Sequence, residues 1–366
     1  MNPLHRCWAE IDLRAFQSNL AQLKERVAPE VRFAAVIKAD AYGHGLPAVA
    51  VALADKIDLL AVANVAEAQE IRTAGVNTPI MILGPATPEE LSVVVQERFI
   101  PTLSTAEEGR RLAALVTGEP LEVHFVFDTG MGRIGLWTPE AAAEFHSLAQ
   151  LPQIRVTALS SHLPVADDDP DYTVDQLKRF RAGAKQFSSA LPVTVLNSAA
   201  ILRIGRTAEK GDIVRTGLAL YGVSPLAEFQ PLFRPVLSLK TRAILVRTVA
   251  AGRDISYGRT FTTSHETKVA TIAAGYGDGY PRHLSNVDAE VLIHGRRCPV
   301  LGRVTMDQIM VDVSDVPDVT FGDEVVLIGR QGTEEILASE LARKAGTIAW
   351  EIFTGITKRA VRVYLR

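Results

Sequence analysis

Phe33-Ala34-Ala35-Val36-Ile37-Lys38 is the stretch of sequence that decides the fold. An apolar run of this length is typical of a buried strand. The run ends on a lysine and enters Ala39-Asp40-Ala41-Tyr42-Gly43-His44-Gly45, where two glycines allow the backbone to turn tightly and approach a ligand. The sequence therefore predicts a buried strand that carries Lys38 at its carboxyl end.

The same alternation of a short strand and a longer segment of helical period recurs before and after this run. Helix-length stretches such as Val65–Ala74, Pro88–Arg98 and Tyr172–Ala190 separate most of the strands, and the connection Ser198–Gly211 is the least helix-like. The predicted strands are Arg32–Lys38, Leu59–Asn64, Pro79–Gly84, Ile100–Ser104, Val123–Asp128, Ile154–His162, Val193–Asn197 and Asp212–Tyr221.

Strands and helices that alternate in this way predict an α/β fold, a (β/α)8 TIM-type barrel. An open doubly wound sheet is the alternative. It is disfavoured because no G-x-G-x-x-G motif follows an early strand.

The pattern changes after Pro235, where strand-like runs are separated by Gly, Asp and Pro. One helix is predicted from Glu334 to Lys344. We therefore expect a barrel domain over residues 1–233 and a mainly β domain over residues 234–366. The predicted strands of the second domain are Lys240–Val249, Lys268–Ala274, Glu290–His294, Gln308–Val313 and Glu324–Ile328.

Composition narrows the class of protein. The 366 residues are 47% apolar, and 39 basic against 42 acidic residues give a net charge of -3. No basic block suits nucleic acid, and no apolar run is long enough to span a membrane. Cys7 and Cys298 form no C-x-x-C pair, and the histidines show no metal-ligand spacing. We expect a cytoplasmic protein with no metal, nucleic-acid or membrane partner.

Polar groups follow several predicted strands, and the site of such a barrel lies at the carboxyl ends of its strands. A lysine there is usually a solvated rim residue, but a partly buried one can lose its proton and form a Schiff base. Ser198 at a helix start and the glycine turn of Arg215-Thr216-Gly217-Leu218 suit a phosphate, or are simply a cap and a turn. The strand-end residues are Lys38, Asp128, Arg133, His162, Asn197, Ser198 and Arg215.

Seven motifs in order, across both predicted domains, resemble the alanine racemase family. The first is Ala35-Val36-Ile37-Lys38-Ala39-Asp40-Ala41-Tyr42-Gly43-His44-Gly45, which is similar to that family's cofactor-lysine signature. The others are Asp128-Thr129-Gly130-Met131-Gly132-Arg133, Asn197-Ser198, Arg215-Thr216-Gly217, Ser256-Tyr257-Gly258, Gly275-Tyr276-Gly277-Asp278-Gly279 and Gly302-Arg303-Val304-Thr305-Met306-Asp307.

The resemblance implies an isomerase that interconverts L-alanine and D-alanine on a pyridoxal phosphate aldimine and supplies D-alanine for peptidoglycan. It implies a homodimer with sites at the interface, each completed by Tyr257 and Met306 of the other subunit. It also implies that the first segment, residues 1–12, packs with the second domain.

The resemblance also implies residue roles. Lys38 and Tyr257 are the two bases, one for each face of the α-carbon. Arg215 faces the pyridine nitrogen and leaves it unprotonated, and His162 flanks the ring and bonds to Arg215. Arg133 and the backbone at Met306 hold the substrate carboxylate, and Tyr276 and Arg282 line the entrance. The remaining cofactor-binding residues are Tyr42, Asn197, Ser198, Gly217, Leu218 and Trp350.

Two positions depart from the family pattern. Val126 stands where members often have a lysine modified to a carbamate, so either another group or an anion orients Arg133, or Arg133 is held more loosely. Trp350 stands where members often have a phosphate-binding tyrosine, and an indole donates one hydrogen bond but accepts none. The alternatives are therefore a serine or broad-spectrum racemase, a decarboxylase on the same fold, or a protein that only holds the cofactor.

Overall fold

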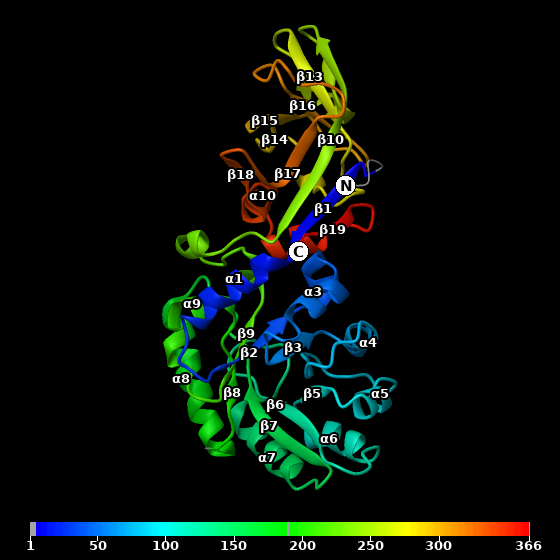
Figure 1. Ribbon diagram of the computed structural model, residues 1–366. Helices are drawn as coiled ribbons and strands as arrows, with labels where there is room; N and C mark the ends of the chain where they lie inside the picture. The colour runs from blue at the N-terminus through cyan, green and yellow to red at the C-terminus, as the bar shows by residue number, and fades with distance from the viewer. Residues whose placement is uncertain (1–4, 189, 366) are drawn as a thin grey trace. The chain divides into compact units, whose positions relative to one another are not determined.

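A computed structural model of the chain describes residues 5–188 and 190–365. The chain divides into two compact units (Figure 1). We call Phe16–Ala41 together with Leu46–Phe233 the barrel unit. The β unit consists of the chain up to Ala15, residues Tyr42–Gly45 and the chain from Arg234 onward. Residues 1–4 of the predicted first segment, and Arg366, lie outside the described residues.

The barrel unit contains an eight-stranded parallel sheet in the order β8-β7-β6-β5-β4-β3-β2-β9. Its two ends approach each other, because the Arg215 N–H donates to the carbonyl of Leu196, just beyond β8, at 2.9 Å. The predicted barrel architecture is thus confirmed. The strands are β2 (Arg32–Val36), β3 (Leu59–Val62), β4 (Ile80–Ile82), β5 (Ile100–Leu103), β6 (Leu121–Val126), β7 (Ile154–Ser160), β8 (Val193–Thr194) and β9 (Ile213–Thr216).

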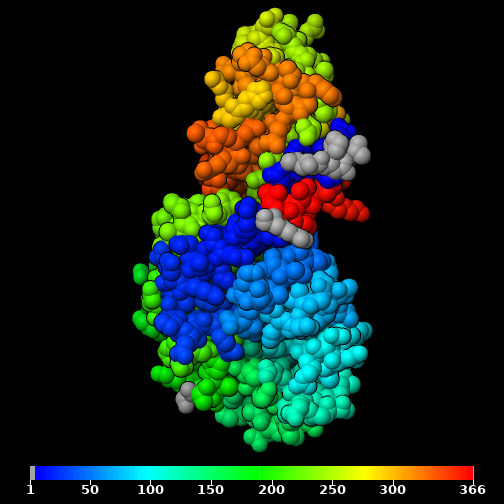
Figure 2. Space-filling view, in the orientation of Figure 1, coloured from blue at the N-terminus to red at the C-terminus, as the bar shows by residue number. Residues whose placement is uncertain are grey.

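Helices follow the strands and lie outside the sheet, and side chains fill the spaces between the ribbons (Figures 1 and 2). Several helices begin at a residue whose side chain accepts a backbone N–H, as Asn64, Thr105 and Asp169 do. The helices are α1 (Leu13–Lys24), α3 (Leu46–Leu53), α4 (Val65–Thr73), α5 (Leu91–Gln96), α6 (Ala106–Ala113), α7 (Thr138–Ala149), α8 (Pro170–Phe187) and α9 (Ser198–Ile204).

The predicted strands are correctly placed but too long at their carboxyl ends. The prediction for the last strand ran to Tyr221, whereas β9 ends at Thr216 and a 3-10 helix, η2, covers Leu218–Tyr221. The connection after β8, which looked least helical, contains α9 and the 3-10 turn η1 (Gly205–Thr207). The segments that follow the strands therefore begin as turns or short helices, and they carry most of the predicted site residues.

The β unit is built on antiparallel pairs that close on themselves. The pairings run β10–β13–β16–β15–β14–β17 and return to β10. A closed ring of this kind leaves no free edge among its members. These strands are β10 (Leu237–Val249), β13 (Thr267–Ile272), β14 (Glu290–Ile293), β15 (Arg296–Leu301), β16 (Ile309–Asp312) and β17 (Glu324–Gln331).

Two strands from the chain ends extend this sheet. β1 (Cys7–Asp12) pairs antiparallel with β10, and β19 (Val361–Leu365) pairs parallel with β1. The N-terminal strand thus belongs to the sheet of the C-terminal strands. Short elements complete the unit: β11 (Asp254–Ile255), β12 (Phe261–Thr262), η4 (Tyr257–Arg259), η5 (Arg282–Leu284) and α11 (Ala349–Thr354).

The predicted helix from Glu334 to Lys344 is wrong at its start. Glu334–Ile336 forms strand β18, which pairs with β17, and helix α10 covers only Ala338–Ala345. Glutamate favours helices, but here the ladder with β17 and the full burial of Ile336 outweigh that preference. The helix then begins after Leu337, whose backbone is extended.

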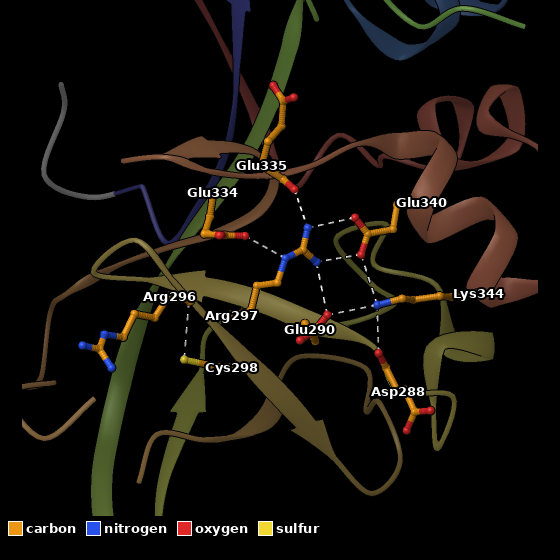
Figure 3. A network of polar contacts seen from close by, with 9 residues as sticks. All are labelled: Asp288, Glu290, Arg296, Arg297, Cys298, Glu334, Glu335, Glu340 and Lys344. Carbon is orange, nitrogen blue, oxygen red and sulfur yellow. Dashed lines mark hydrogen bonds and ion pairs between the residues drawn. The ribbon is translucent and has the colours of Figure 1, made fainter. Parts of the chain in front are cut away.

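Arg297 joins these elements through a network of ion pairs (Figure 3). Its guanidinium donates to Glu334 at 2.9 Å, to Glu290 at 3.1 Å and to both oxygens of Glu340 at 2.8 and 3.1 Å. Lys344 reaches Glu290 and Glu340 from α10 at 3.2 and 3.1 Å. Because one arginine bonds to carboxylates on β14, β18 and α10, the network fixes how these elements meet.

We expect Arg297→Met to lower the unfolding free energy of the β unit by about 2 kcal/mol at neutral pH, because it leaves Glu334 without its cation and Glu290 and Glu340 with Lys344 alone. Burial raises the pKa of the Glu340 carboxyl, but its bonds to Arg297 and Lys344 outweigh this effect and lower the pKa overall. This stabilisation is present above the ordinary carboxylate pKa and is lost as the pH falls below it. The deficit of the variant should therefore shrink in acid.

Urea denaturation at several pH values measures this deficit. Arg296→Met is the matched control, because Arg296 precedes Arg297 on β15 and its side chain points away from the network (Figure 3). An equal loss in both variants would contradict the assignment.

Candidate active site

The chain turns in an unusual way directly after β2. Lys38 begins the short helical segment α2 (Lys38–Gly43), in which Ala39, Asp40, Ala41 and Tyr42 have φ angles of 53°, 53°, 50° and 50°. These angles define a left-handed helical turn built from non-glycine residues. Each such residue costs roughly 1–2 kcal/mol, so the turn persists only where other contacts hold it.

Contacts within each unit hold the turn. In the barrel unit, Asp40 Oδ1 accepts the Leu46 N–H at 2.7 Å, and the Ala41 N–H donates to the Ile37 carbonyl at 2.9 Å. In the β unit, Arg362 donates to the Gly43 carbonyl from Nε at 3.0 Å and from Nη2 at 2.8 Å. Gly43 has a φ of 74°, and a side chain there would collide with the Phe353 carbonyl. The direction in which Lys38 leaves its strand is thereby fixed.

Lys38 is placed among cations in the barrel unit. Burial lowers the pKa of its amine, and Arg133 and Arg215 lower it further, while Glu67 acts in the opposite direction. In the described parts of the chain, no acceptor lies within hydrogen-bonding distance of this amine. Burial and the two arginines thus act in favour of the neutral amine, which is the nucleophilic form.

Arg215 lies on β9 and is almost fully buried. Its Nη1 donates to the carbonyl and hydroxyl oxygens of Thr194 at 2.6 and 2.8 Å, and its Nη2 donates to the Ser161 carbonyl at 2.7 Å. Burial and Arg133 lower its pKa to about 10, so it stays cationic at neutral pH. Both terminal nitrogens are occupied by protein, and the Nε–H has no acceptor among the described residues.

His162 is kept neutral by burial and by its cationic neighbours. Burial, then Arg215, Arg133 and Lys38, lower the pKa of its imidazole to about 3. Its Nδ1 accepts from Arg215 Nη2 at 3.2 Å, and its carbonyl accepts from the Gln176 side chain at 2.8 Å. The predicted contact between His162 and Arg215 is therefore present. A neutral ring with a fixed plane can lie against an aromatic ligand without adding charge.

The segments that follow β8 and β9 meet through Ser198. The side chain of Asn197 caps α9, and Ser198 Oγ accepts the Gly217 N–H at 2.9 Å, which leaves the serine proton free to donate. Leu218 is the first residue of η2, so its N–H has no acceptor within that helix. A hydroxyl proton and a free amide beside a buried cation are donors that suit a phosphate.

Arg133 follows a tight turn held by Asp128, whose carboxylate accepts the N–H groups of Gly130, Met131 and Gly132 at 2.7, 2.9 and 2.5 Å. The arginine itself is exposed. Over residues 5–188 and 190–365, no carboxylate pairs with it. Val126 is buried at the end of β6, opposite Ser160 of β7, and offers no polar group. The structure thus contains no protein anion that orients Arg133.

Four predicted residues of the β unit lie on loops or 3-10 turns with exposed side chains. Tyr257 is 71% exposed and Met306 is 51% exposed, which is unusual for large apolar side chains. Tyr276 is also exposed, and so is Arg282 in η5. The loops of Tyr276 and Met306 are joined, because the Tyr276 N–H donates to the Thr305 carbonyl at 3.0 Å and the Gly277 N–H to the Met306 carbonyl at 2.9 Å.

A buried carboxylate connects these two loops. Asp278 accepts from Arg359 Nε and Nη2 at 3.1 and 3.2 Å, and Arg359 Nη1 donates to Asp307 at 2.8 Å. Asp278 and Asp307 both lie in motifs that the sequence analysis singled out, but neither received a role there. Nothing in the sequence pattern indicated Arg359.

Trp350 contacts Tyr42 within the β unit. Burial raises the pKa of Tyr42 to about 12, and a side-chain hydrogen bond with Trp350 opposes that rise. Because an indole N–H can only donate, the Tyr42 oxygen accepts this bond. The tryptophan therefore contacts one of the predicted cofactor-binding residues directly.

Comparison with known proteins agrees with this geometry. Residues 11–225 match the family described as "Alanine racemase, N-terminal domain", and residues 236–364 match "Alanine racemase, C-terminal domain". The chain belongs to the alanine racemase family. A curated alanine racemase from Halothermothrix orenii is 41% identical over 98% of this chain and 96% of its own length. One from Symbiobacterium thermophilum is 42% identical over the same shares.

Solved structures of the family have the same fold. The biosynthetic alanine racemase of Pseudomonas aeruginosa superposes with a TM-score of 0.91 at 34% identity, covering 99% of this chain and 100% of that chain. The Bacillus anthracis alanine racemase with bound L-Ala-P gives a TM-score of 0.88 at 36% identity, covering 99% and 95% of the two chains. The resemblance inferred from the seven motifs is thus confirmed.

Among the described residues, no cluster of three or more His, Cys, Asp or Glu side chains is arranged to hold a metal ion. No helix in this part of the chain is long and apolar enough to cross a membrane.

The isolation of Arg133 leads to a test. We expect a small anion such as chloride to bind the guanidinium in place of a protein carboxylate, since this exposed cation has no carboxylate partner among the described residues. Crystals soaked in bromide should show an anomalous peak at Arg133, and the peak should be absent in Arg133→Met. Density for a protein carboxylate bonded to Arg133, with no bromide peak, would contradict this expectation.

Proposed function

We propose that this protein interconverts L-alanine and D-alanine with pyridoxal phosphate held on Lys38. The observation that carries the proposal is the placement of Lys38: an amine of lowered pKa that faces the buried Arg215–His162 pair. Membership of the alanine racemase family supports the same reaction. D-alanine is a building block of peptidoglycan, which we propose as the destination of the product.

The donor set of the barrel unit fits the cofactor. Arg215 keeps one N–H free for a pyridine nitrogen, and neutral His162 lies beside it. Ser198, Gly217 and Leu218, together with Tyr42 and Trp350, would hold the phosphate. Asn197 fixes the start of α9 on which Ser198 lies. When bound, pyridoxal phosphate supplies an electron-withdrawing ring that stabilises negative charge on the substrate α-carbon.

The chain's own groups then handle one proton. Lys38 takes or returns the α-proton on one face, and Tyr257 of the partner subunit does so on the other, so that configuration inverts and no atom is gained or lost. Arg133 and the backbone at Met306 hold the substrate carboxylate, and Tyr276 and Arg282 line the entrance. The exposure of Tyr257 and Met306 supports a homodimer in which each subunit completes the site of the other.

We propose the same division of labour for the domains. Residues 1–233 hold the cofactor, and residues 234–366 contribute to the site of the partner. The first segment, residues 1–12, packs with the second domain, which the pairing of β1 with β10 supports. Cys7 and Cys298 are buried free thiols, which suits the reducing cytoplasm.

Trp350 favours one second candidate, a racemase of broader substrate range. Its indole is bulky and contacts Tyr42, a residue that we assign to the cofactor phosphate. A decarboxylase is disfavoured, because such enzymes normally set a carboxylate against the pyridine nitrogen and this site holds Arg215. A chiral assay of the purified protein against a panel of L-amino acids ranks these possibilities, and alanine should be converted fastest.

Lys38 is expected to carry the cofactor. The wild-type protein should be yellow, and borohydride should fix the label on the peptide that contains Lys38. Lys38→Ala should lack the colour and lose at least about 1,000-fold in activity, because it loses both the covalent link and a base. A label on any other lysine means that the site is misassigned.

The proposed sharing of bases between subunits can be tested by mixing two inactive variants. Lys38→Ala and Tyr257→Phe homodimers should each be inactive. A heterodimer of the two contains one site with both bases, so mixing with subunit exchange should restore up to about one quarter of wild-type activity per site, by random pairing of equal amounts. If heterodimers form and activity stays at the level of the parents, Tyr257 does not act across the interface.

A further inference from the structure

Glu67 connects the turn at Lys38 to the neighbouring strand of the barrel. It lies in the first turn of α4, which follows β3. Its Oε1 accepts the Ala39 N–H at 2.7 Å, and its Oε2 accepts the Ala63 N–H at 2.8 Å. Ala39 follows Lys38 directly, and Ala63 directly follows β3, the parallel neighbour of β2. One carboxylate thus joins the carboxyl ends of two adjacent strands.

The bond to Ala39 acts at the start of a strained stretch of backbone. Ala39 is the first residue with a positive φ after Lys38, and three more non-glycine residues follow in the same conformation. Because Ala39 lies in the first turn of α2, its N–H has no acceptor within that segment, and a partner has to be supplied from outside the turn. Asp40 holds the far end of the turn through Leu46, and Glu67 holds the near end.

The start of α4 fixes the backbone of Glu67. Asn64 caps α4 by accepting the Glu67 N–H at 3.0 Å, so the cap is complete without the glutamate side chain. That side chain is free to reach back across both strand ends. A carboxylate in the first turn of a helix is also a favourable partner for the helix dipole.

Charge gives Glu67 a second effect on Lys38. The groups that face the Lys38 amine are Arg133 and Arg215, both cationic, and His162, which is neutral. Burial lowers the pKa of Lys38, the two arginines lower it further, and Glu67 raises it. Among the described residues, Glu67 is the one carboxylate that opposes the arginines at this amine.

We propose that Glu67 is a positioning residue for Lys38, which anchors the left-handed turn that aims the amine and supplies the negative charge that balances its cationic neighbours. It touches neither substrate nor cofactor and acts only through Lys38. Without it, the amine would lose both its fixed direction and the negative charge that opposes the two arginines. This inference rests on the proposed role of Lys38, although its structural part can be tested without it.

Three variants of the full chain test the proposal. Glu67→Gln keeps the shape, removes the charge and leaves a single carbonyl oxygen for two N–H donors. Glu67→Ala removes both bonds. Glu70→Gln is the matched control. Glu70 lies on the same helix and carries the same charge, but its side chain accepts no N–H of the Lys38 turn.

Hydrogen exchange read by mass spectrometry tests the anchoring. In Glu67→Ala, the amides of Ala39 and Ala63 should exchange about three- to tenfold faster than in the wild type, as expected for the loss of one hydrogen bond each. In Glu67→Gln, at least one of these two amides should also exchange faster than in the wild type. Glu70→Gln should match the wild type. Unchanged exchange at both positions in Glu67→Gln and Glu67→Ala would overturn the anchoring role.

The charge effect is read from how fast Lys38 reacts with added pyridoxal phosphate at different pH values, with the cofactor first removed from every variant. The rate follows the neutral fraction of the amine. Loss of Glu67 lowers the pKa of Lys38, so the midpoint for Glu67→Gln should move to lower pH by about half to one unit. A midpoint that stays in place, or one that Glu70→Gln moves equally, would overturn the proposal.

These readings are separate from the racemase assignment. The reaction of Lys38 with pyridoxal phosphate is followed without any amino acid, and racemisation is measured in its own chiral assay. A wild-type protein that turns yellow at Lys38 but leaves alanine unchanged would remove the proposed function and leave the role of Glu67 to be judged by the variants. If Glu67→Ala fails to fold, Glu67→Gln alone decides.

Discussion

A guanidinium buried inside a parallel barrel has to be surrounded by acceptors, and the arrangement of this site depends on how Arg215 meets that demand. A lone buried charge is costly, and Arg215 is paired with no carboxylate among the described residues. It uses neutral oxygens of Thr194 and Ser161 and one nitrogen of His162 instead. Because the charge is not cancelled, it acts on every titratable group near it.

That uncancelled charge adds to the effect of burial on its neighbours. Burial is the largest cause of the lowered pKa of His162, and Arg215 lowers it further; for Lys38, burial and Arg133 lower the pKa more than Arg215 does. A carboxylate at the position of Arg215 would act in the opposite direction on both groups and would also favour protonation of a pyridine nitrogen. A cation at this position leaves the pyridine nitrogen unprotonated and therefore makes the ring a weaker electron sink. A weaker sink favours return of the proton to the α-carbon.

Much of this arrangement could be predicted from sequence, and the limits have physical causes. Lys38, Ser198 and Arg215 lie at the ends of apolar runs, and such runs are visible as local patterns. Glu67 and Arg359 are different, because each stands where a charged surface residue is ordinary, and only the three-dimensional pairing of distant segments gives it a role. Thr194 belongs to the same group, since its bond to Arg215 depends on the closure of the barrel. The segment Glu334–Ile336 was misjudged because its strand is set by pairing with β17 and not by propensity.

The position of β1 in the sheet has a consequence for synthesis on the ribosome. β1 emerges before the barrel unit, yet Cys7 pairs with Thr241 and Trp8 with Val361. The barrel unit, by contrast, is complete once Phe233 has emerged. The nascent chain therefore holds a strand without a partner while the barrel folds behind it, and β19 can add to the sheet only after the barrel and the other strands of the β unit have been synthesised. Long-range pairing of this kind delays closure of the β unit and makes its unfinished sheet the part of the newborn protein that is most open to capture by a chaperone.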